Sequence, residues 1–308
     1  MTDFSKKEKI KRITQGILGL SALPTIIAKM IELVDNPKTS ASTLGKLIST
    51  DQVLTARVLK LANSAFYGFP RRISTINLAI VVLGFDTLKD LGLSFSIINR
   101  FSSNIRDTGF DMSRFWEHSI GCGVAGKMLA KRYRYRITGE VFVAGLLHDI
   151  GKLVVNQYIT EDFKKIQKKV NNSGVSFIEA EKEILGVTHA EIGKWLVEKW
   201  NLPSQLCDSI AYHHKPLMSK KNRFLASIIN FSDYLCKIAN IGYSGDDIIP
   251  EISPEIVKVL KLKQNEDGDI DIDFYKDLLY LELDRAETFI NIIQGKDVPE
   301  KKEVKIKV

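Results

Sequence analysis

Apolar residues recur at helical spacing through most of this chain, whereas the alternating pattern of a half-buried strand is scarce. Asp51 is a typical helix N-cap and precedes an apolar run with the spacing of one helix face. Ser74 or Thr75 begins a second run, INLAIVVL, which Gly84 ends. Length alone would allow a buried strand at 80–83, but the flanking caps and the lack of a partner strand favour a helix. The sequence therefore predicts an all-α, multi-helical bundle.

Capping signals locate further helices. Ser176 with Glu179 and Thr188 with Glu191 have the spacing of a capping box, in which side chain and backbone N–H groups satisfy each other in both directions. The run EVFVAGLLHDIGKLVV predicts a buried helix that is interrupted near Gly151. Other expected helix starts are Asp86, Ser113 and Pro203, and two more helices are expected at 224–237 and near 274–293.

The length of 308 residues exceeds what one compact core usually holds, so we expect more than one lobe. A polar segment, NIGYSGDDIIPEISPE, separates a strongly apolar region from the C-terminal part, and the charged end KDVPEKKEVKIKV is expected to fray. We expect an N-terminal helical lobe at 1–110, a helical core at 111–240, and a C-terminal helical extension with a charged tail at 241–308.

Composition indicates a globular protein of the cytoplasm. Apolar residues make up 44% of the chain, which is ample for a core. No stretch approaches the roughly 20 apolar residues that a membrane span requires, and the charged N-terminus lacks a signal-peptide pattern. The three cysteines, Cys122, Cys207 and Cys236, lack CxxC spacing and are expected to be small buried residues in a reducing compartment.

The net charge of +7 leaves several kinds of partner open. The densest basic run, KMLAKRYRYR at 127–136, is interpreted as a solvated helix end, with a phosphate-attracting rim as the alternative. Arg71 and Arg72 lie in an expected loop and could meet an anionic partner. No N-terminal helix carries the cluster of Arg, Lys, Asn and Gln that reads bases, so a nucleic-acid partner is not expected.

The histidines and two aspartates form a pattern that suits metal binding. His148 is followed directly by Asp149 in the apolar run LLHDIGK. Asp233 lies in another apolar run, FLASIINFSDYL, where a carboxylate is costly to bury unless a cation or hydrogen bonds compensate. Imidazole and carboxylate suit Fe, Mn, Zn, Co and Ni, and an aspartate can bridge two ions. The chain has five histidines: His118, His148, His189, His213 and His214.

Each of these residues also has a simpler interpretation. A single histidine such as His118 or His189 is more often a structural residue than a ligand, so the joint pattern carries the hypothesis. Lys152, four residues after His148, would share its helix face and could hold a phosphate oxygen. His118 and Cys122 lie one helical turn apart and could share a zinc ion, although Cys122 between two glycines is more typical of close packing.

The order of these residues resembles the HD superfamily of metal-dependent phosphohydrolases, and most closely the ligand set of the HD-GYP cyclic-dinucleotide phosphodiesterases. The resemblance implies two divalent cations, with Fe or Mn favoured over Zn, Co or Ni. It also implies catalytic roles for Asp149 and for Lys152, which would face a substrate phosphate. The implied metal ligands are His118, His148, Asp149 and Asp233 for one ion, and His189, His213 and His214 for the other, with Asp149 bridging.

The N-terminal half resembles the HDOD domain, a helical output domain of bacterial signalling proteins. The pieces that carry this resemblance are LPTI, STDQVLTARVLKLANSAFYG and ISTINLAIVVLG, and it extends from about Leu18 to His214. HDOD domains are similar to HD domains, and many of them have lost the metal ligands. The two resemblances together imply an HD-like helical bundle with an N-terminal helical lobe.

The sequence departs from the HD-GYP pattern at two places. After His213 and His214 it reads KPLMSKKN, without a GYP element. Arg114 lies one turn before His118, where some HD-GYP proteins place a glutamate for a third metal, so Arg114 could approach a phosphate instead. Hydrolysis of cyclic di-GMP and a trinuclear centre are therefore not expected.

Two functions from different classes remain open. The favoured one is a bacterial signal-transduction or regulatory HDOD protein that acts on a signalling partner, with a structural or sensory dinuclear metal centre. The alternative is a metal-dependent phosphohydrolase that acts on a phosphorylated small molecule such as a nucleotide or cyclic dinucleotide. The HDOD resemblance favours regulation, because most of that family is without demonstrated catalysis, and the intact ligand set favours chemistry.

Overall fold

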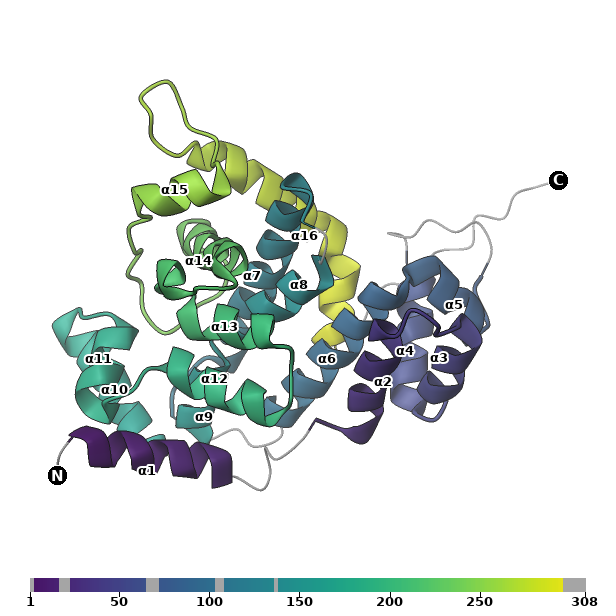
Figure 1. Cartoon of the computed structure of the whole chain (residues 1–308), viewed down its shortest axis with the longest axis horizontal. Helices are drawn as coiled ribbons and strands as arrows, with labels where there is room; N and C mark the ends of the chain where they lie inside the picture. Colours follow the sequence, from purple (N-terminus) through teal and green to yellow (C-terminus); the bar gives the residue numbers. More distant parts are fainter. Residues whose placement is uncertain (1–2, 17–22, 65–71, 103–107, 136–137, 296–308) are drawn as a thin grey trace. The chain divides into compact units, whose positions relative to one another are not determined.

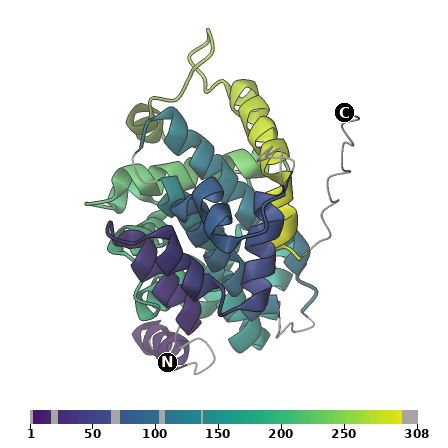
Figure 2. The same ribbon diagram turned by 90° about the vertical axis from the view of Figure 1, so that its right-hand side faces the viewer.

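The computed structural model describes residues 3–16, 23–64, 72–102, 108–135 and 138–295. Across these residues the ribbon consists of helices and their connections, and one isolated antiparallel bridge joins Gln264 to Ile270 (Figures 1 and 2). The predicted all-α class is confirmed. None of the helices within the described ranges is long and apolar enough to cross a membrane.

The described residues pack as two compact units. The larger lies within Met1–Ala22 and Arg100–Glu282, and the smaller within Leu23–Asn99 and Leu283–Val308. The first helix, α1 (Asp3–Gly16), packs against α12 (His189–Lys199) of the larger unit. The three-part division expected from the sequence remains a prediction of domain organisation.

Several helices of the smaller unit begin at a polar N-cap. Asp51 Oδ1 accepts a hydrogen bond from Leu54 N at 2.9 Å, as expected of an N-cap. Thr75, and not Ser74, caps the next helix, which Gly84 ends with a positive φ of 78°. The helices are α2 (Thr25–Asp35), α3 (Ala41–Ile48), α4 (Gln52–Ala62), α5 (Ile76–Leu83), the first part of α6 (Phe85–Ser102) and the last part of α16 (Ile272–Ile293).

The larger unit surrounds a core in which α7 (Met112–Arg132) packs against both α8 (Thr138–Leu147) and α14 (Arg223–Ile238). A second contact joins α9 (Ile150–Tyr158) to α12, which in turn packs on α13 (Ser204–Tyr212). Its remaining elements are α10 (Thr160–Ser173), α11 (Phe177–Leu185), α13 (Ser204–Tyr212), the 3-10 turn η3 (Pro216–Met218), α15 (Pro254–Leu260) and the first part of α16 (Ile272–Ile293).

Two glycines allow the helices of this unit to approach closely. A Cβ at Gly145 would lie 2.6 Å from the carbonyl oxygen of Cys122, and a Cβ at Gly151 would lie 2.0 Å from that of His189. Both neighbours are backbone atoms, which cannot move aside as a flexible side chain could. Gly145 therefore holds α8 against α7, and Gly151 holds α9 against α12.

The capping predictions are mostly confirmed. Both capping boxes are present, at Ser176 with Glu179 and at Thr188 with Glu191. Pro203 directly precedes α13, and the helices expected at 224–237 and near 274–293 are α14 and α16.

Three predicted boundaries are wrong by a few residues. Helix α7 is capped by Asp111, whose carboxylate accepts from Arg114 N, and not by Ser113. Helix α6 already begins at Phe85, so Asp86 lies in its first turn. The interruption expected near Gly151 falls at His148 and Asp149, between α8 and α9.

The basic run lies at the end of α7, as the favoured interpretation predicted. Lys131 forms an ion pair with Glu282 at 3.4 Å, and the Arg132 guanidinium lies 4.8 Å from the ring centre of Phe274. Arg136 and Arg71 lie outside the described residues. All three cysteines are buried free thiols, as expected.

Candidate metal centre

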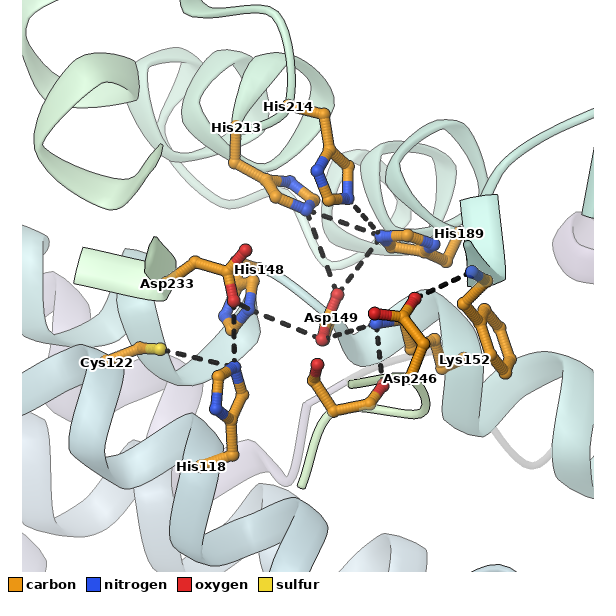
Figure 3. A network of polar contacts seen from close by, with 12 residues as sticks. His118, Cys122, His148, Asp149, Lys152, His189, His213, His214, Asp233 and Asp246 are labelled. Carbon is orange, nitrogen blue, oxygen red and sulfur yellow. Dashed lines mark hydrogen bonds and ion pairs between the residues drawn. The ribbon is translucent and has the colours of Figure 1, made fainter. Parts of the chain in front are cut away.

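The break between α8 and α9 presents two predicted ligands at the centre of the larger unit. His148 and Asp149 stand between the last residue of α8 and the first of α9. Asp149 occupies the N-cap position of α9, but its carboxylate accepts no capping hydrogen bond from the helix. The other predicted ligands converge here from α7, α12, the end of α13 and α14 (Figure 3).

The first group of potential ligand atoms joins α7, the helix break and α14. It comprises His118, Cys122, His148 and Asp233, and its ligand atoms all lie within 4.8 Å of one another. His118 Nε2 lies 3.0 Å from Asp233 Oδ1 and 3.5 Å from Cys122 Sγ. His148 Nε2 lies 3.9 Å from the same Asp233 oxygen.

The second group joins the helix break to α12 and the end of α13. It comprises Asp149, His189, His213 and His214, again within 4.8 Å of one another. His189 Nε2 lies 3.3 Å from His213 Nε2 and 2.8 Å from His214 Nε2. Imidazole nitrogens that face each other this closely are arranged as they would be around a shared cation.

Asp149 lies between the two groups (Figure 3). Its Oδ2 is 3.4 Å from His148 Nε2, and its Oδ1 is 3.1 Å from His189 Nε2 and 3.8 Å from His213 Nε2. One oxygen thus faces each group, which is the arrangement of a carboxylate that bridges two ions. The structure brings all seven predicted metal-binding residues together, and their role as ligands stays a prediction.

Hydrogen bonds at Nδ1 aim four of the histidines inward. Nδ1 of His118 donates to Ile241 O at 3.2 Å, and Nδ1 of His148 donates to Gly145 O at 2.7 Å. Nδ1 of His213 donates likewise to Ile210 O at 2.7 Å. A bound Nδ1–H leaves Nε2 as the free nitrogen, and metal-ligating histidines typically have this pattern.

The fourth histidine reveals a residue that the sequence analysis missed. Glu181 of α11 is fully buried, and its Oε2 accepts from His189 Nδ1 at 2.6 Å and from His189 N at 2.8 Å. A carboxylate behind a histidine ring fixes the tautomer and makes Nε2 more basic. The only signal in the sequence was that Glu181 falls on the apolar side of a capped helix.

Lys152 does not occupy the predicted position. The helix break separates it from His148, so the two do not share one helix face. Its buried Nζ donates to Asp149 Oδ2 at 2.7 Å and to Ser244 O at 2.8 Å. Lys152 is therefore engaged by the protein, and a contact with a substrate phosphate stays a prediction.

The charges in the centre balance one another. Burial alone would raise the pKa of Asp149, but attraction to His148, Lys152 and His189 holds it well below its ordinary value. Burial and then repulsion by neighbouring histidines lower the pKa values of His213 and His214 well below the ordinary value. Asp149 is thus a carboxylate and these two rings are neutral, which are the forms that bind metal.

In the first group, one buried atom lacks a hydrogen bond within the described ranges. His148 Nε2 has no hydrogen bond there, although the side chain is fully buried. An unsatisfied buried nitrogen costs free energy unless something binds it. Since it faces Asp149 and Asp233, a divalent cation between them would satisfy it, and the residues present fit such an ion.

The segment after α14 covers one side of the centre. Lys237 forms ion pairs with Asp233 at 3.7 Å and with Asp246 at 3.8 Å. Arg114, considered above as a phosphate contact, instead donates from Nη2 to Gly242 O at 3.0 Å. A small cavity of about 230 Å³ lies here, between His118 and this segment. Sequence reasoning did not find the segment, because nothing in its composition shows that it returns to the histidines.

A larger cavity, of about 480 Å³, opens beside His214. His214 is the one ligand candidate that is partly exposed. Lysines dominate the charged lining, and Lys7 of α1 forms an ion pair with Glu191 across it. The lining lysines are Lys7, Lys11, Lys182, Lys194 and Lys215, beside the aromatic rings of Trp195 and Tyr212.

A helical bundle that gathers histidines and aspartates at a helix break is an HD-like domain. Residues 20–216 match the profile of the HDOD domain, and the chain belongs to the HDOD domain family. It is 28% identical to an HDOD domain protein of unknown function from Geobacter sulfurreducens. That crystal structure matches with a TM-score of 0.74 over 94% of this chain and 98% of the other.

Other similar proteins differ in how they are described. A candidate phosphohydrolase from Shewanella amazonensis is 25% identical, with a TM-score of 0.69 over 91% of this chain and 97% of the other. A candidate signal transduction protein from Marinobacter aquaeolei has the same fold at 21% identity, with a TM-score of 0.75 over 95% of this chain and 66% of that one. An uncharacterized protein of Treponema pallidum is 26% identical over 72% of this chain, which spans 43% of that relative.

Proposed function

We propose that this HDOD protein is a regulatory protein of signal transduction with a dinuclear metal centre that is structural or sensory. One observation carries the proposal: six of the seven candidate ligands are at most 3% exposed, and of the seven only His118 and His214 line one of the two cavities described above. Turnover requires a substrate to reach the ions in a reactive geometry, and this arrangement leaves little of the centre accessible.

The residues would hold two ions on either side of Asp149. His118, His148 and Asp233 would hold the first, and His189, His213 and His214 the second. Bound divalent cations would neutralise the buried carboxylates and tie helices together, as structural metals do. The hydrogen bonds of Lys152 to Asp149 and Ser244 O support this role. They already engage the ammonium group that would otherwise bind a substrate phosphate.

The regulatory role needs a partner that reads the state of the centre. We propose a signalling protein as that partner, and we place the protein in the cytoplasm. The proposal keeps the three lobes expected from the sequence, at 1–110, 111–240 and 241–308. The description of the Marinobacter protein as a candidate for signal transduction agrees with this proposal at the level of the fold.

A second function is a metal-dependent phosphohydrolase. The cavity beside His214 favours it, because its lysines would attract phosphate and its aromatic rings would suit a base. A candidate phosphohydrolase also stands among the similar structures. In that case Asp149 would hold the ions, and a substrate would have to reach them past His214.

The test measures metal content and hydrolysis on the same protein. Untagged protein, wild type and His148→Ala/Asp149→Ala, is analysed for bound metals and assayed with bis(p-nitrophenyl) phosphate. The proposal expects about two equivalents of metal in the wild type, their loss in the variant, and no hydrolysis above the variant. Metal-dependent hydrolysis that the variant lacks would establish the phosphohydrolase, and a wild type that binds no metal under any loading would contradict both functions.

A further inference from the structure

We propose that Cys122 is a ligand of the first metal position, so that this position holds a thiophilic divalent ion such as Zn(II), Co(II) or Fe(II). The inference deepens the proposed function and rests on its metal centre. It makes the two positions chemically different, since only the first would contain sulfur. The sulfur ligand would come from the same helix as His118 and lie one turn further along.

The geometry around Cys122 matches that of a shared ion. Metal bonds of about 2.3 Å to sulfur and about 2.0–2.1 Å to nitrogen, at angles of about 90–110°, separate the two ligand atoms by about 3.1–3.6 Å. Cys122 Sγ lies 3.5 Å from His118 Nε2. His118 Nε2 lies 3.0 Å from Asp233 Oδ1, within the range expected for nitrogen and oxygen on one ion.

A second observation points to a ligand at this place. The four atoms of the group are Sγ of Cys122, Nε2 of His118 and His148, and an Asp233 oxygen, and each lies within 4.8 Å of the others. His148 Nε2 is fully buried and has no hydrogen-bond partner within the described residues. Two nitrogens, one oxygen and one sulfur from three parts of the chain suit a zinc-like ion, with the bridging Asp149 as a fifth ligand.

The close contact between α7 and α8 does not require the sulfur of Cys122. In the tight contact of α7 with α8, the backbone of Cys122 faces Gly145. A Cβ added at Gly145 would lie 2.6 Å from the carbonyl oxygen of Cys122. Any small side chain would allow this contact, because it depends on the glycine opposite. The thiol points toward His118, as Figure 3 shows, and it also interacts with the Cys236 thiol.

A thiolate at the first position has a consequence for both ions. It adds one negative charge to the two carboxylates of the centre, so the loaded centre attracts anions less than a set of histidines and aspartates alone. Manganese prefers oxygen and nitrogen, and thiolate selects against it at this position. A buried structural or sensory centre is consistent with both effects.

The test uses cobalt as a spectroscopic probe on the full chain. Metal-stripped protein is loaded with Co(II), and its near-ultraviolet absorption is recorded for the sulfur-to-cobalt charge-transfer band. The wild type and the Cys207→Ser/Cys236→Ser variant, in which Cys122 is the only cysteine, should both show the band. Cys122→Ser should lose the band and keep the visible cobalt absorption of the remaining ligands.

The control must separate Cys122 from Cys236, which is equally buried and also lies near α7. A Cβ added at Gly121 of α7 would lie 3.3 Å from the sulfur of Cys236. A band that survives in Cys122→Ser, or is lost in Cys207→Ser/Cys236→Ser, would overturn the assignment. Cobalt bound by the wild type without the band would overturn this inference alone. No binding of cobalt by any variant would overturn the metal centre with it.

A competition experiment supplies an independent readout. Removal of the thiolate should weaken Zn(II) binding at one of the two positions by more than the 10–100-fold typical of losing an outer partner. Mn(II) binding should change little between the wild type and Cys122→Ser. Equal losses for the two ions would contradict a sulfur ligand.

Discussion

His189 Nδ1 lies 2.6 Å from Oε2 of Glu181, and the carboxylate accepts the backbone N–H of His189 as well. The ring of His189 is therefore held at two points by one buried side chain. Its Nε2 faces Asp149, His213 and His214, which are the other members of the second group. Glu181 thus orients a candidate metal ligand without facing the metal position itself.

Glu181→Gln should weaken the second position selectively. The amide oxygen can still accept the hydrogen bonds from His189, but it is neutral and leaves His189 Nε2 less basic. We expect about a 10–100-fold loss of affinity for one of two metal equivalents, measured by competition with a chelator. Glu183→Gln is the control, since Glu183 is exposed on the same helix and pairs only with Lys169 among the described residues. Equal effects of the two substitutions would contradict the role of Glu181.

Metal affinity should rise with pH. Burial would lower the pKa of His118, but Cys122 and Asp233 raise it to about 10 in the absence of metal. A cation must displace this proton, because metal binds only the neutral ring. Between pH 6 and 8 the affinity of the first position should therefore increase by up to about tenfold per pH unit for each proton released. Calorimetry in buffers of different ionisation enthalpy counts the protons, and binding without proton release would contradict the prediction.

Lys152→Met should destabilise the protein strongly. The change removes the charge and both hydrogen bonds of Nζ and leaves Asp149 and Ser244 O without that partner. Breaking a buried pair in this way costs about 3–5 kcal/mol, which urea unfolding of the metal-free protein would measure. Lys165→Met is the matched control, because Lys165 makes the same i,i+3 contact to Asp162 at the surface. A catalytic but not structural Lys152 would lower turnover and leave the unfolding free energy unchanged.

Gly151→Ala should also destabilise the larger unit. The new Cβ would lie 2.0 Å from the carbonyl oxygen of His189, so α9 and α12 would have to separate. Overpacking of this kind typically costs about 1–3 kcal/mol, again measurable by urea unfolding. Gly16→Ala meets nothing within 4 Å and should have no comparable effect. A stable Gly151→Ala variant would show that the two helices do not require this close approach.

The candidate ligands could be found from the sequence because their residue types are costly to bury without a reason. His148, Asp149 and Asp233 lie in apolar runs, and that contrast is visible without a structure. Most helix starts could be predicted from capping residues, because capping depends only on residues close together in the sequence. The all-α class followed from the same local signals.

Other features depend on contacts between distant segments and could not be predicted. Glu181 resembles any glutamate of an amphipathic helix until the fold buries it against His189. The partners of Lys152 include Ser244 O, 92 residues away along the chain. The interruption at His148 was placed three residues late, because Gly151 is the usual sign of a break, whereas here it permits close packing with α12.

The candidate ligands of one ion come from parts of the chain as distant as His118 and Asp233, which are separated by 115 residues. Such an ion binds the folded chain and not the unfolded one, so each tenfold rise in free metal above the dissociation constant adds about 1.4 kcal/mol to the stability of the fold. The lifetime of the protein in a cell would then follow the supply of metal. The fraction of molecules that remain folded would therefore report the concentration of free metal.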